Sequence, residues 1–289
     1  MSGLRVLPAR PLWLNKKIDL EKCRELNALF KDLDLNTICH QARCPNISEC
    51  FTARVATFLI LGKICTRGCK FCAVSSGIPF DADLSESKRV AEAVRKLGLK
   101  HVVVTSVTRD DLADGGSSIF ASAINEIRNL NHTARIEVLV PDFKGDTSSI
   151  ETIIRAKPDI FAHNMETVSS LYDQVRQQAD YSRSLSVLKA AKELDKNIYI
   201  KSGIMLGLGE TEEQVLEVLS DLRQAGCDFL SIGQYLSPSP QHFQVKEYVL
   251  PQVFEFFKKR AKHLGFIHVQ SAPYVRSSYL ACRYLQNCH

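Results

Sequence analysis

From about residue 55 onward, short runs of β-branched residues alternate with amphipathic stretches, and this alternation limits the fold more than any other feature of the sequence. The predicted strands are Thr57–Gly62, His101–Ser106, Arg135–Val140, Asp159–His163, Asn197–Ile204 and Asp228–Gly233. The predicted helices, with apolar residues at three- and four-residue spacing, are Glu86–Leu97, Ser117–Asn129, Ser148–Arg155, Arg183–Leu194, Glu212–Ala225 and Leu250–Leu264. Repeated β-α units with apolar strands predict a parallel sheet with right-handed crossovers.

Six β-α units are too few to close an eightfold barrel. We therefore predict an α/β fold, a partial (β/α)6 barrel of the TIM type, with an open doubly wound sheet as the alternative. Residues 1–54 and 267–289 fall outside the repeat and are expected to be extensions that cover the ends of a barrel formed by residues 55–266. Polar residues and glycines gather directly after the strands, at the edge where such folds carry their active sites.

Six of the ten cysteines form two triplets, Cys39-x4-Cys44-x5-Cys50 and Cys65-x3-Cys69-x2-Cys72. Each triplet offers three thiolates, whereas a closed structural zinc site takes four ligands. Three thiolates suit a [4Fe–4S] cluster that leaves one iron for another ligand. The remaining cysteines have no ligand role that the pattern supports: Cys23, Cys227, Cys282 and Cys288.

Clustered, unevenly spaced cysteines in a chain of 289 residues favour a metal protein of a reducing compartment over a secreted disulfide scaffold, so we expect a cytoplasmic protein. No apolar run is long enough to span a membrane, and the N-terminus lacks the apolar core of a secretory signal. The net charge of +5 gives no reason to expect nucleic acid as a partner. The basic residues near the N-terminus, Arg5, Arg10, Lys16 and Lys17, and the basic tail form either a solvated surface or a docking face for an acidic partner.

The second triplet, with an aromatic residue directly before its last cysteine, resembles the signature of the radical S-adenosylmethionine (SAM) superfamily. In that family the open iron of the cluster is chelated by SAM, and reduction cleaves SAM to methionine and a 5′-deoxyadenosyl radical. Arg67 and Lys70, between the cysteines, are expected to offset the charge of the thiolates. The alternative, a zinc knuckle that pairs cysteines across the triplets, lacks the paired rhythm of zinc sites.

The segment Gly203-Ile204-Met205-Leu206-Gly207-Leu208-Gly209-Glu210 resembles the Gly-x-Ile-x-Gly-x-x-Glu segment that lines the SAM pocket in that superfamily, with Met205 in the place of the isoleucine. Taken alone it is only a glycine-rich turn between a strand and a helix, and a plain loop remains the alternative.

The first triplet, with Pro45-Asn46 and Glu49 embedded in it, resembles the auxiliary-cluster motif of the lipoyl synthase family. Further matches run from about Pro11 to Tyr279 and include the tail Val275-Arg276-Ser277-Ser278-Tyr279. The chain departs from the family at Ser271-Ala272-Pro273, where Ser-Gly-Pro is usual, and at Leu280-Ala281, where His-Ala is usual. Both departures flank the tail serines without replacing them.

This resemblance implies site residues. Ser278, with Ser277 the lesser candidate, would bind the fourth iron of the auxiliary cluster, and an alkoxide beside thiolates is a labile ligand suited to a cluster that comes apart. Residues expected to bind SAM at or near the carboxyl ends of the strands are Thr105, Ser106, Asn164, Glu166, Arg183, Lys201, Gly203, Gly207, Glu210 and Tyr235. Arg183 would pair with the SAM carboxylate, and Tyr235 would pack on the adenine or serve in the core. Asp110, Asp111 and Asp114 are either general acids and bases or, as we favour, helix caps and loop ion pairs.

The implied activity is radical insertion of sulfur at carbons 6 and 8 of an octanoyl chain on a lysine of a lipoyl carrier domain, with two [4Fe–4S] clusters, SAM as cosubstrate and the auxiliary cluster as sulfur source. Implied partners are acyltransferase subunits of 2-oxoacid dehydrogenases, the glycine-cleavage H protein, a flavodoxin or ferredoxin and a cluster-repair protein. Alternatives are another radical SAM sulfur inserter of the biotin synthase or methylthiotransferase kind, a non-catalytic iron–sulfur carrier and a zinc-stabilised binding protein.

Overall fold

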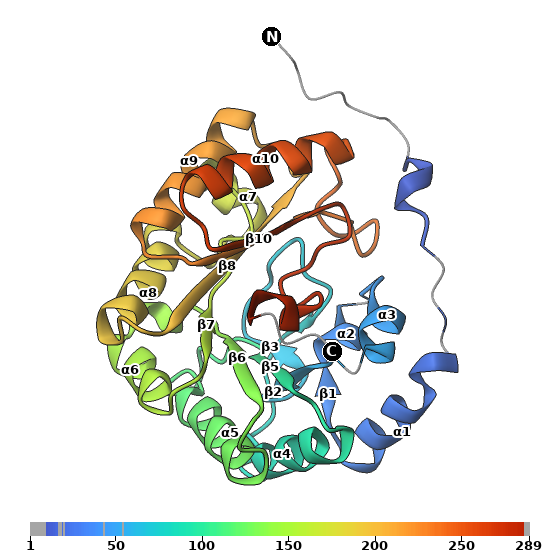
Figure 1. Ribbon diagram of the computed structural model, residues 1–289, viewed down its shortest axis with the longest axis vertical. Helices are drawn as coiled ribbons and strands as arrows, with labels where there is room; N and C mark the ends of the chain where they lie inside the picture. The colour runs from blue at the N-terminus through green and yellow to red at the C-terminus, as the bar shows by residue number, and fades with distance from the viewer. Residues whose placement is uncertain (1–9, 17–18, 20, 43, 54, 286–289) are drawn as a thin grey trace.

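The computed structural model describes residues 10–16, 19, 21–42, 44–53 and 55–285. One sheet of eight strands runs in the order β1-β2-β5-β6-β7-β8-β9-β10 and curves into a ring, with helices on its outer side (Figure 1). The strands are β1 (Asn36–Thr37), β2 (Thr57–Ile60), β5 (His101–Ser106), β6 (Arg135–Leu139), β7 (Ile160–Ala162), β8 (Tyr199–Leu206), β9 (Phe229–Gln234) and β10 (His268–Ser271). All neighbours pair in parallel except β1, which is antiparallel to β2.

The outer helices are α4 (Glu86–Leu97), α5 (Ser117–Leu130), α6 (Thr147–Arg155), α8 (Tyr181–Leu194), α9 (Glu212–Gln224) and α10 (Pro251–His263). Side chains that cap the first backbone amides determine where two of these helices begin. Asp146 accepts hydrogen bonds from the amides of Ser148 and Ser149 at the start of α6, and Thr211 and Gln214 form a capping box on α9. Their apolar faces and the almost wholly buried strands form one core on both sides of the sheet.

These observations confirm the predicted partial barrel. The bounds of β5 and α4 are those predicted, and the other predicted elements begin or end within a few residues of expectation. The number of parallel strands is larger than predicted, because β10 pairs with β9 and extends the sheet by a seventh strand. The sequence does not predict this strand, His268–Ser271, because three of its four residues are polar and it carries no apolar run.

The N-terminal segment folds against the ring as short helices, η1 (Leu12–Leu14), η2 (Glu21–Cys23), α1 (Arg24–Asp32), α2 (Ile38–Gln41) and α3 (Ile47–Thr52). After β10 the chain turns into the middle of the ring and ends in η5 (Ala281–Leu285), drawn in dark red in Figure 1. The ring of Tyr284 lies 5.3 Å from that of Phe229, so the last described turn fills the interior of the barrel. Among the helices of the described residues, none is long and apolar enough to cross a membrane.

Candidate active site

The second triplet lies in the loop that follows β2, and the two ends of this loop form strands that pair with each other. β3 (Ile64–Cys65) and β4 (Ser75–Ser76) form a small parallel pair on either side of it. The Cys65 sulfur accepts hydrogen bonds from the amides of Arg67 at 3.4 Å and Thr108 at 3.3 Å. The amide of Gly77 donates to the carbonyl of Cys65 at 3.0 Å. Backbone groups therefore fix the first cysteine of the loop.

Arg67 anchors the same loop through buried ion pairs. Its guanidinium binds Asp110 at 2.6 Å and Asp142 at 2.7 Å, and the Asp142 carboxylate also accepts from Arg183 at 2.8 Å. Although burial raises the pKa of Asp142, the bonds and charge of Arg67 hold it well below its usual range. The Arg67 charge also lowers the pKa of Cys69 against the effect of burial, in the direction predicted for a residue that offsets thiolate charge.

A second support holds the far end of the loop. His242 bonds the carbonyl of Cys72 at 3.1 Å, and the amide of Phe243 donates to the carbonyl of Lys70 at 2.8 Å. Tyr235 is buried, donates to the carbonyl of Phe243 at 2.6 Å and belongs to a small core cluster that includes Phe71. The structure thus gives Tyr235 the core role that was one of its two expected roles.

The first triplet lies on α2 and α3. The amide of Cys44 donates to the carbonyl of Cys39 at 2.9 Å, and the amide of Cys50 donates to the carbonyl of Asn46 at 3.0 Å. The C-terminal tail passes directly over these helices, since the Tyr279 hydroxyl donates to Glu49 at 3.0 Å. The Leu280 amide hydrogen-bonds the Cys50 thiol.

The thiols of each triplet lie close enough together to act on one another. Burial and, to a smaller extent, the neighbouring thiols of the same triplet raise the pKa of Cys39 and of Cys72 to about 12. Within the described ranges no three or more His, Cys, Asp and Glu side chains are placed to hold a single metal ion. A cubane makes no such demand, because each of its irons takes its own thiolate.

Four of the residues predicted to bind SAM lie beside this loop at the carboxyl edge of the sheet. Thr105 and Ser106 end β5, and Asn164 and Glu166 follow β7. Thr105 is engaged with the carbonyl of Leu139 at 2.8 Å. The Ser106 hydroxyl is buried and has no hydrogen-bond partner in the described part of the chain, as expected where a polar ligand is to bind.

Glu166 has the most strained backbone of this group, with φ of 67°. Such left-handed geometry costs a non-glycine residue roughly 1 kcal/mol and gathers at functional sites. Its carboxylate accepts from Asn164 at 3.0 Å, and burial raises its pKa.

The glycine-rich segment forms a turn that Glu210 holds closed. The Glu210 carboxylate accepts from the amides of Gly207 at 2.5 Å and Leu208 at 2.9 Å, so this side chain shapes the turn from within. Gly207 has φ of 98°, and any side chain there would collide with Gln234 and the carbonyl of Glu247. Gly203 lies inside β8, next to Asn164.

Lys201 lies elsewhere than expected, whereas Arg183 lies near the carboxyl ends of the strands but is already paired with a carboxylate. Lys201 is the third residue of β8, fully buried, with its ammonium 2.8 Å from Glu137 and 3.9 Å from the centre of the Tyr284 ring. It therefore belongs to a buried ion pair in the barrel interior and not to the carboxyl end of its strand. Arg183 lies in the first turn of α8 and is joined to Asp142, so part of its guanidinium is already engaged.

Arg176 is a site residue that the sequence did not reveal. It is buried and donates to the Asn164 carbonyl at 3.1 Å and to Tyr172 and Ser184 at 3.2 Å. Its charge acts on Glu166 and on Cys69, lowering the pKa of both against the effect of burial. It follows α7 (Tyr172–Val175), a short helix without a pattern that marks it in the sequence.

The three aspartates after β5 have the structural roles that we favoured. Asp110 pairs with Arg67, and Asp111 pairs with Arg109 at 2.8 Å. Asp114 accepts from the amides of Gly116 and Ser118 at the start of α5, both at 2.9 Å.

The tail serines differ in their partners. Ser277 donates to the Asn164 side chain at 3.0 Å, across 113 residues of sequence. Ser278 makes no hydrogen bond with the part of the chain that the structure describes. Of the two hydroxyls, that of Ser278 is therefore the one more available to bind another group.

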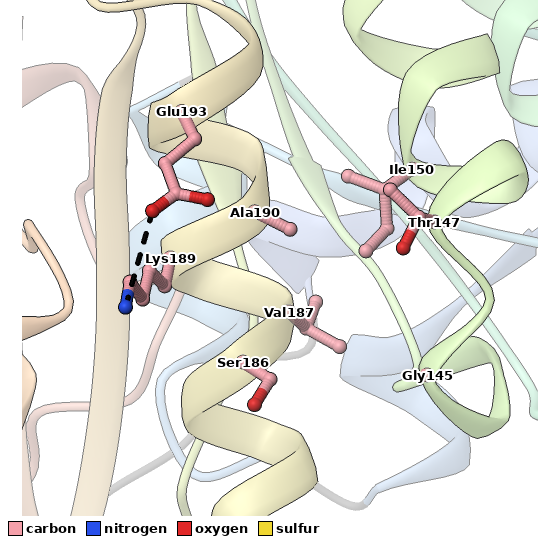
Figure 2. A pocket seen from close by; sticks show the side chains of 8 residues that line it. All are labelled: Gly145, Thr147, Ile150, Ser186, Val187, Lys189, Ala190 and Glu193. Atoms are coloured by element: carbon pink, nitrogen blue, oxygen red, sulfur yellow. Dashed lines mark ion pairs between the residues drawn. The ribbon is translucent and has the colours of Figure 1, made fainter.

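One hollow of about 280 Å³ lies away from all of these residues, on the outer side of the barrel. Figure 2 shows Val187 and Ala190 of α8 facing Thr147 and Ile150 of α6 across it. No cysteine lines it, so it takes no part in the site described above.

Solved structures share this fold. SuiB of Streptococcus suis bound to S-adenosylmethionine has a TM-score of 0.59 at 14% identity, over 87% of this chain and 60% of that chain. HydG, a maturase of the [FeFe]-hydrogenase, has a TM-score of 0.57 at 14% identity, over 92% of this chain and 74% of that chain. At this identity the likeness concerns the fold alone.

Sequence comparison is more specific. Residues 59–233 match the radical SAM superfamily. The chain is 56% identical to the lipoyl synthase of Caldicellulosiruptor saccharolyticus, over 94% of this chain and 96% of the relative. It is 55% identical to the lipoyl synthase of Caldanaerobacter subterraneus (94% and 95%) and 52% identical to that of Citrifermentans bemidjiense (96% and 95%). The chain therefore belongs to the lipoyl synthase family within the radical SAM superfamily.

Proposed function

We propose that this enzyme inserts two sulfur atoms, at carbons 6 and 8, into an octanoyl chain carried on a lysine of a lipoyl carrier domain. Membership of the radical SAM superfamily implies SAM and a [4Fe–4S] cluster as cofactors. We assign that cluster to Cys65, Cys69 and Cys72, and a second, auxiliary cluster to Cys39, Cys44, Cys50 and Ser278. In this assignment residues 1–54 and 267–289 serve the auxiliary cluster and residues 55–266 serve SAM.

The observation that carries the proposal is the path of the tail. One turn, Ser277 to Tyr279, touches Asn164 at the carboxyl edge of the barrel and Glu49 on the helix of the first triplet. The same turn therefore contacts a residue predicted to bind SAM and the helix that carries Cys50. A substrate methylene held there has the SAM residues on one side and the first triplet on the other, which is the positioning that a reaction at an unactivated carbon needs.

When bound, the resident cluster and SAM supply the 5′-deoxyadenosyl radical that removes a hydrogen atom from carbon 6 and, in a second turnover, from carbon 8. The auxiliary cluster would be a substrate: two C–H bonds break as their hydrogens pass to two molecules of 5′-deoxyadenosine, two C–S bonds form as Fe–S bonds break, and the iron of that cluster would accept one electron for each carbon radical captured. The first triplet must then release iron, for which the oxygen ligand Ser278 is suited.

The protein residues bind and orient. Ser106, Asn164 and Glu166 offer polar groups at the carboxyl edge, and Arg176 fixes the last two from below. The buried Arg67–Asp142 pair holds the cysteine loop against the sheet. Phe71, within the cysteine loop, packs against the small apolar cluster that contains Tyr235.

The proposed partners are octanoylated carrier domains, among them acyltransferase subunits of 2-oxoacid dehydrogenases and the glycine-cleavage H protein. A flavodoxin or ferredoxin supplies electrons, and a cluster-repair protein rebuilds the auxiliary cluster. The support for these partners is the family membership together with the basic character of the chain, +5 overall, which favours acidic partners.

Anaerobic reconstitution tests the proposal. The chain should take up about eight irons, in two clusters of four, and convert an octanoyl-lysyl peptide into a product two sulfur atoms heavier when SAM and a reductant are added. Eight irons and 5′-deoxyadenosine without sulfur in the peptide would keep the radical chemistry and exclude this substrate. About four irons, or no cleavage of SAM, would contradict the two-cluster assignment.

A further inference from the structure

Lys16 joins the first triplet to the serine turn, although neither the triplet nor the turn is near it in sequence. Its ammonium lies 2.6 Å from the Asn46 side-chain oxygen and 2.7 Å from Glu49, both on the chain segment that carries Cys44 and Cys50. The same ammonium lies 4.9 Å from the centre of the Tyr274 ring and 5.6 Å from that of Tyr279. One cation thus contacts the helix of the triplet and a tyrosine on each side of Ser277-Ser278.

Two further bonds complete this contact. Asn46 donates to the carbonyl of Tyr274 at 2.6 Å, and Tyr279 donates to Glu49 at 3.0 Å. Each end of the serine turn is therefore tied to α3 or to the residue before it, and both ties meet at Lys16. We call Lys16, Asn46, Glu49, Tyr274 and Tyr279 the clasp.

The Lys16 side chain is only 15% exposed, which is low for a lysine near a chain end. A lysine kept this far from water with two oxygen partners and two aromatic faces is held in one place. The anchor of its segment is Leu14, which is completely buried.

We propose that Lys16 is a positioning residue that sets the place of the Ser278 hydroxyl at the first triplet, by clasping both ends of the serine turn to the triplet's helix. The inference rests on the proposed function, which makes Ser278 the fourth ligand of the auxiliary cluster. Lys16 itself touches no iron. Its charge lowers the pKa of Cys44 and Cys50 against the effect of burial, and its positioning effect reaches the cluster through the turn that it holds.

The test uses the full chain with Cys65→Ala, Cys69→Ala and Cys72→Ala, so that only the first triplet can hold a cluster. Into this parent we place Lys16→Met, Ser278→Ala, both together and, as the matched control, Lys31→Met on the exposed face of α1. After anaerobic reconstitution, iron per chain, the electron paramagnetic resonance of the reduced cluster and the rate of iron transfer to a chelator are measured.

Lys16→Met should release iron about tenfold faster than the parent, the usual cost of losing a group that orients a metal ligand. Its resonance should move toward that of Ser278→Ala. The two effects should not multiply in the double variant, which should release iron more slowly than the product of the single effects predicts, because the positioning effect of Lys16 requires the serine. Lys31→Met should match the parent, and Tyr279→Phe, which removes one bond of the clasp, should fall between parent and Lys16→Met.

Release by Lys16→Met at the parent rate would overturn the inference, as would rates that multiply in the double variant. A chain with the second triplet intact and Cys39, Cys44 and Cys50 replaced by alanine gives a further check. Lys16→Met must leave its cluster unchanged, and faster iron loss there would show that Lys16 only stabilises the fold. Failure of the parent itself to take up about four irons would instead overturn the second cluster of the proposed function.

Discussion

The two triplets are held in different ways. The loop of the second triplet is fixed by backbone bonds and by Arg67 and Asp142, whose side chains are 5% and 0% exposed. The helices of the first triplet are tied to the tail by Lys16 and Glu49, and the Glu49 side chain is 47% exposed. The Arg67–Asp142 pair is buried in the core of the barrel, whereas the Lys16–Glu49 pair is partly exposed to solvent.

This difference matches the fate proposed for each cluster. A resident cluster benefits from a support that opens only when the barrel unfolds. A cluster that is consumed and rebuilt needs a support that opens locally, and exposed ion pairs contribute little to the energy of closing. The contrast teaches that the ligands alone do not distinguish a permanent site from a sacrificial one, because both offer three thiols. The elements that hold those ligands make the distinction.

The largest effect should come from removing each triplet in turn. Replacing Cys65, Cys69 and Cys72 with alanine should abolish formation of 5′-deoxyadenosine, because no cluster remains to reduce SAM. Replacing Cys39, Cys44 and Cys50 should keep deoxyadenosine formation and abolish sulfur insertion. Chromatography of both products from the same reaction measures the two activities. Loss of SAM cleavage in both variants would contradict separate roles for the triplets.

A smaller effect distinguishes the two supports by stability. Asp142→Asn should lower the free energy of unfolding by about 3 kcal/mol, because it leaves the charge of buried Arg67 partly unpaired. Glu49→Gln, in a pair that solvent screens, should lower it by about 1 kcal/mol or less. Glu151→Gln, which breaks the exposed pair with Arg155 on α6, is the control and should change it by about 0.5 kcal/mol at most. Urea denaturation of the iron-free chains gives all three values, and equal losses for Asp142→Asn and Glu49→Gln would remove the distinction.

The free energy of unfolding of the barrel should also depend on pH. His163 bonds the carbonyl of Val140 at 2.8 Å and Ser184 at 3.1 Å, and burial, aided by the charge of Arg176, lowers its pKa from 6.5 to about 3. The folded protein therefore keeps His163 neutral while the unfolded chain binds a proton below about pH 6.5, so stability is lost as the pH falls from there toward 3. Between about pH 7 and pH 5 this group should cost roughly 2 kcal/mol.

Urea midpoints across that range measure the slope. His163→Gln should flatten it, and His132→Gln, at an exposed turn, should leave it as in the parent. An unchanged slope in His163→Gln would mean that other groups carry the acid sensitivity.

Much of this molecule was predictable because its signals are local. Helix α4 follows from apolar residues at helical spacing that end at Gly98, and β5 follows from an unbroken apolar run. The cysteine spacing and the family resemblance placed both triplets. Strand β10 was not predicted because a four-residue strand with three polar side chains carries almost no periodic signal.

The supports could not be predicted, because each joins residues that are distant in sequence. Lys16 reaches Glu49 across 33 positions, and Arg67 reaches Asp142 across 75. Nothing in the composition of either segment marks those pairs. Lys201 is the converse case: a lysine in a strand suggests an exposed or ligand-binding residue, yet Glu137 compensates its charge in the core. Only the registers of β6 with β7 and of β7 with β8 bring the two residues together.

The smallest effect concerns salt, and it tests the comparison without any substitution. Raising KCl from about 0.1 M to about 1 M shortens the range of electrostatic forces to a few ångströms and weakens exposed pairs more than buried ones. Iron held by the first triplet alone should therefore pass to a chelator about twofold faster at high salt, because the Lys16–Glu49 pair is partly in water. Iron held by the second triplet alone should leave at the same rate at both salt concentrations, since Arg67 and Asp142 are shielded from solvent.

Chelator absorbance follows both rates, with choline chloride replacing KCl to exclude an effect specific to potassium. Equal acceleration at the two triplets would mean that their supports open by the same motion, and the proposed difference between a resident and a consumable site would then have to lie in the Ser278 ligand alone.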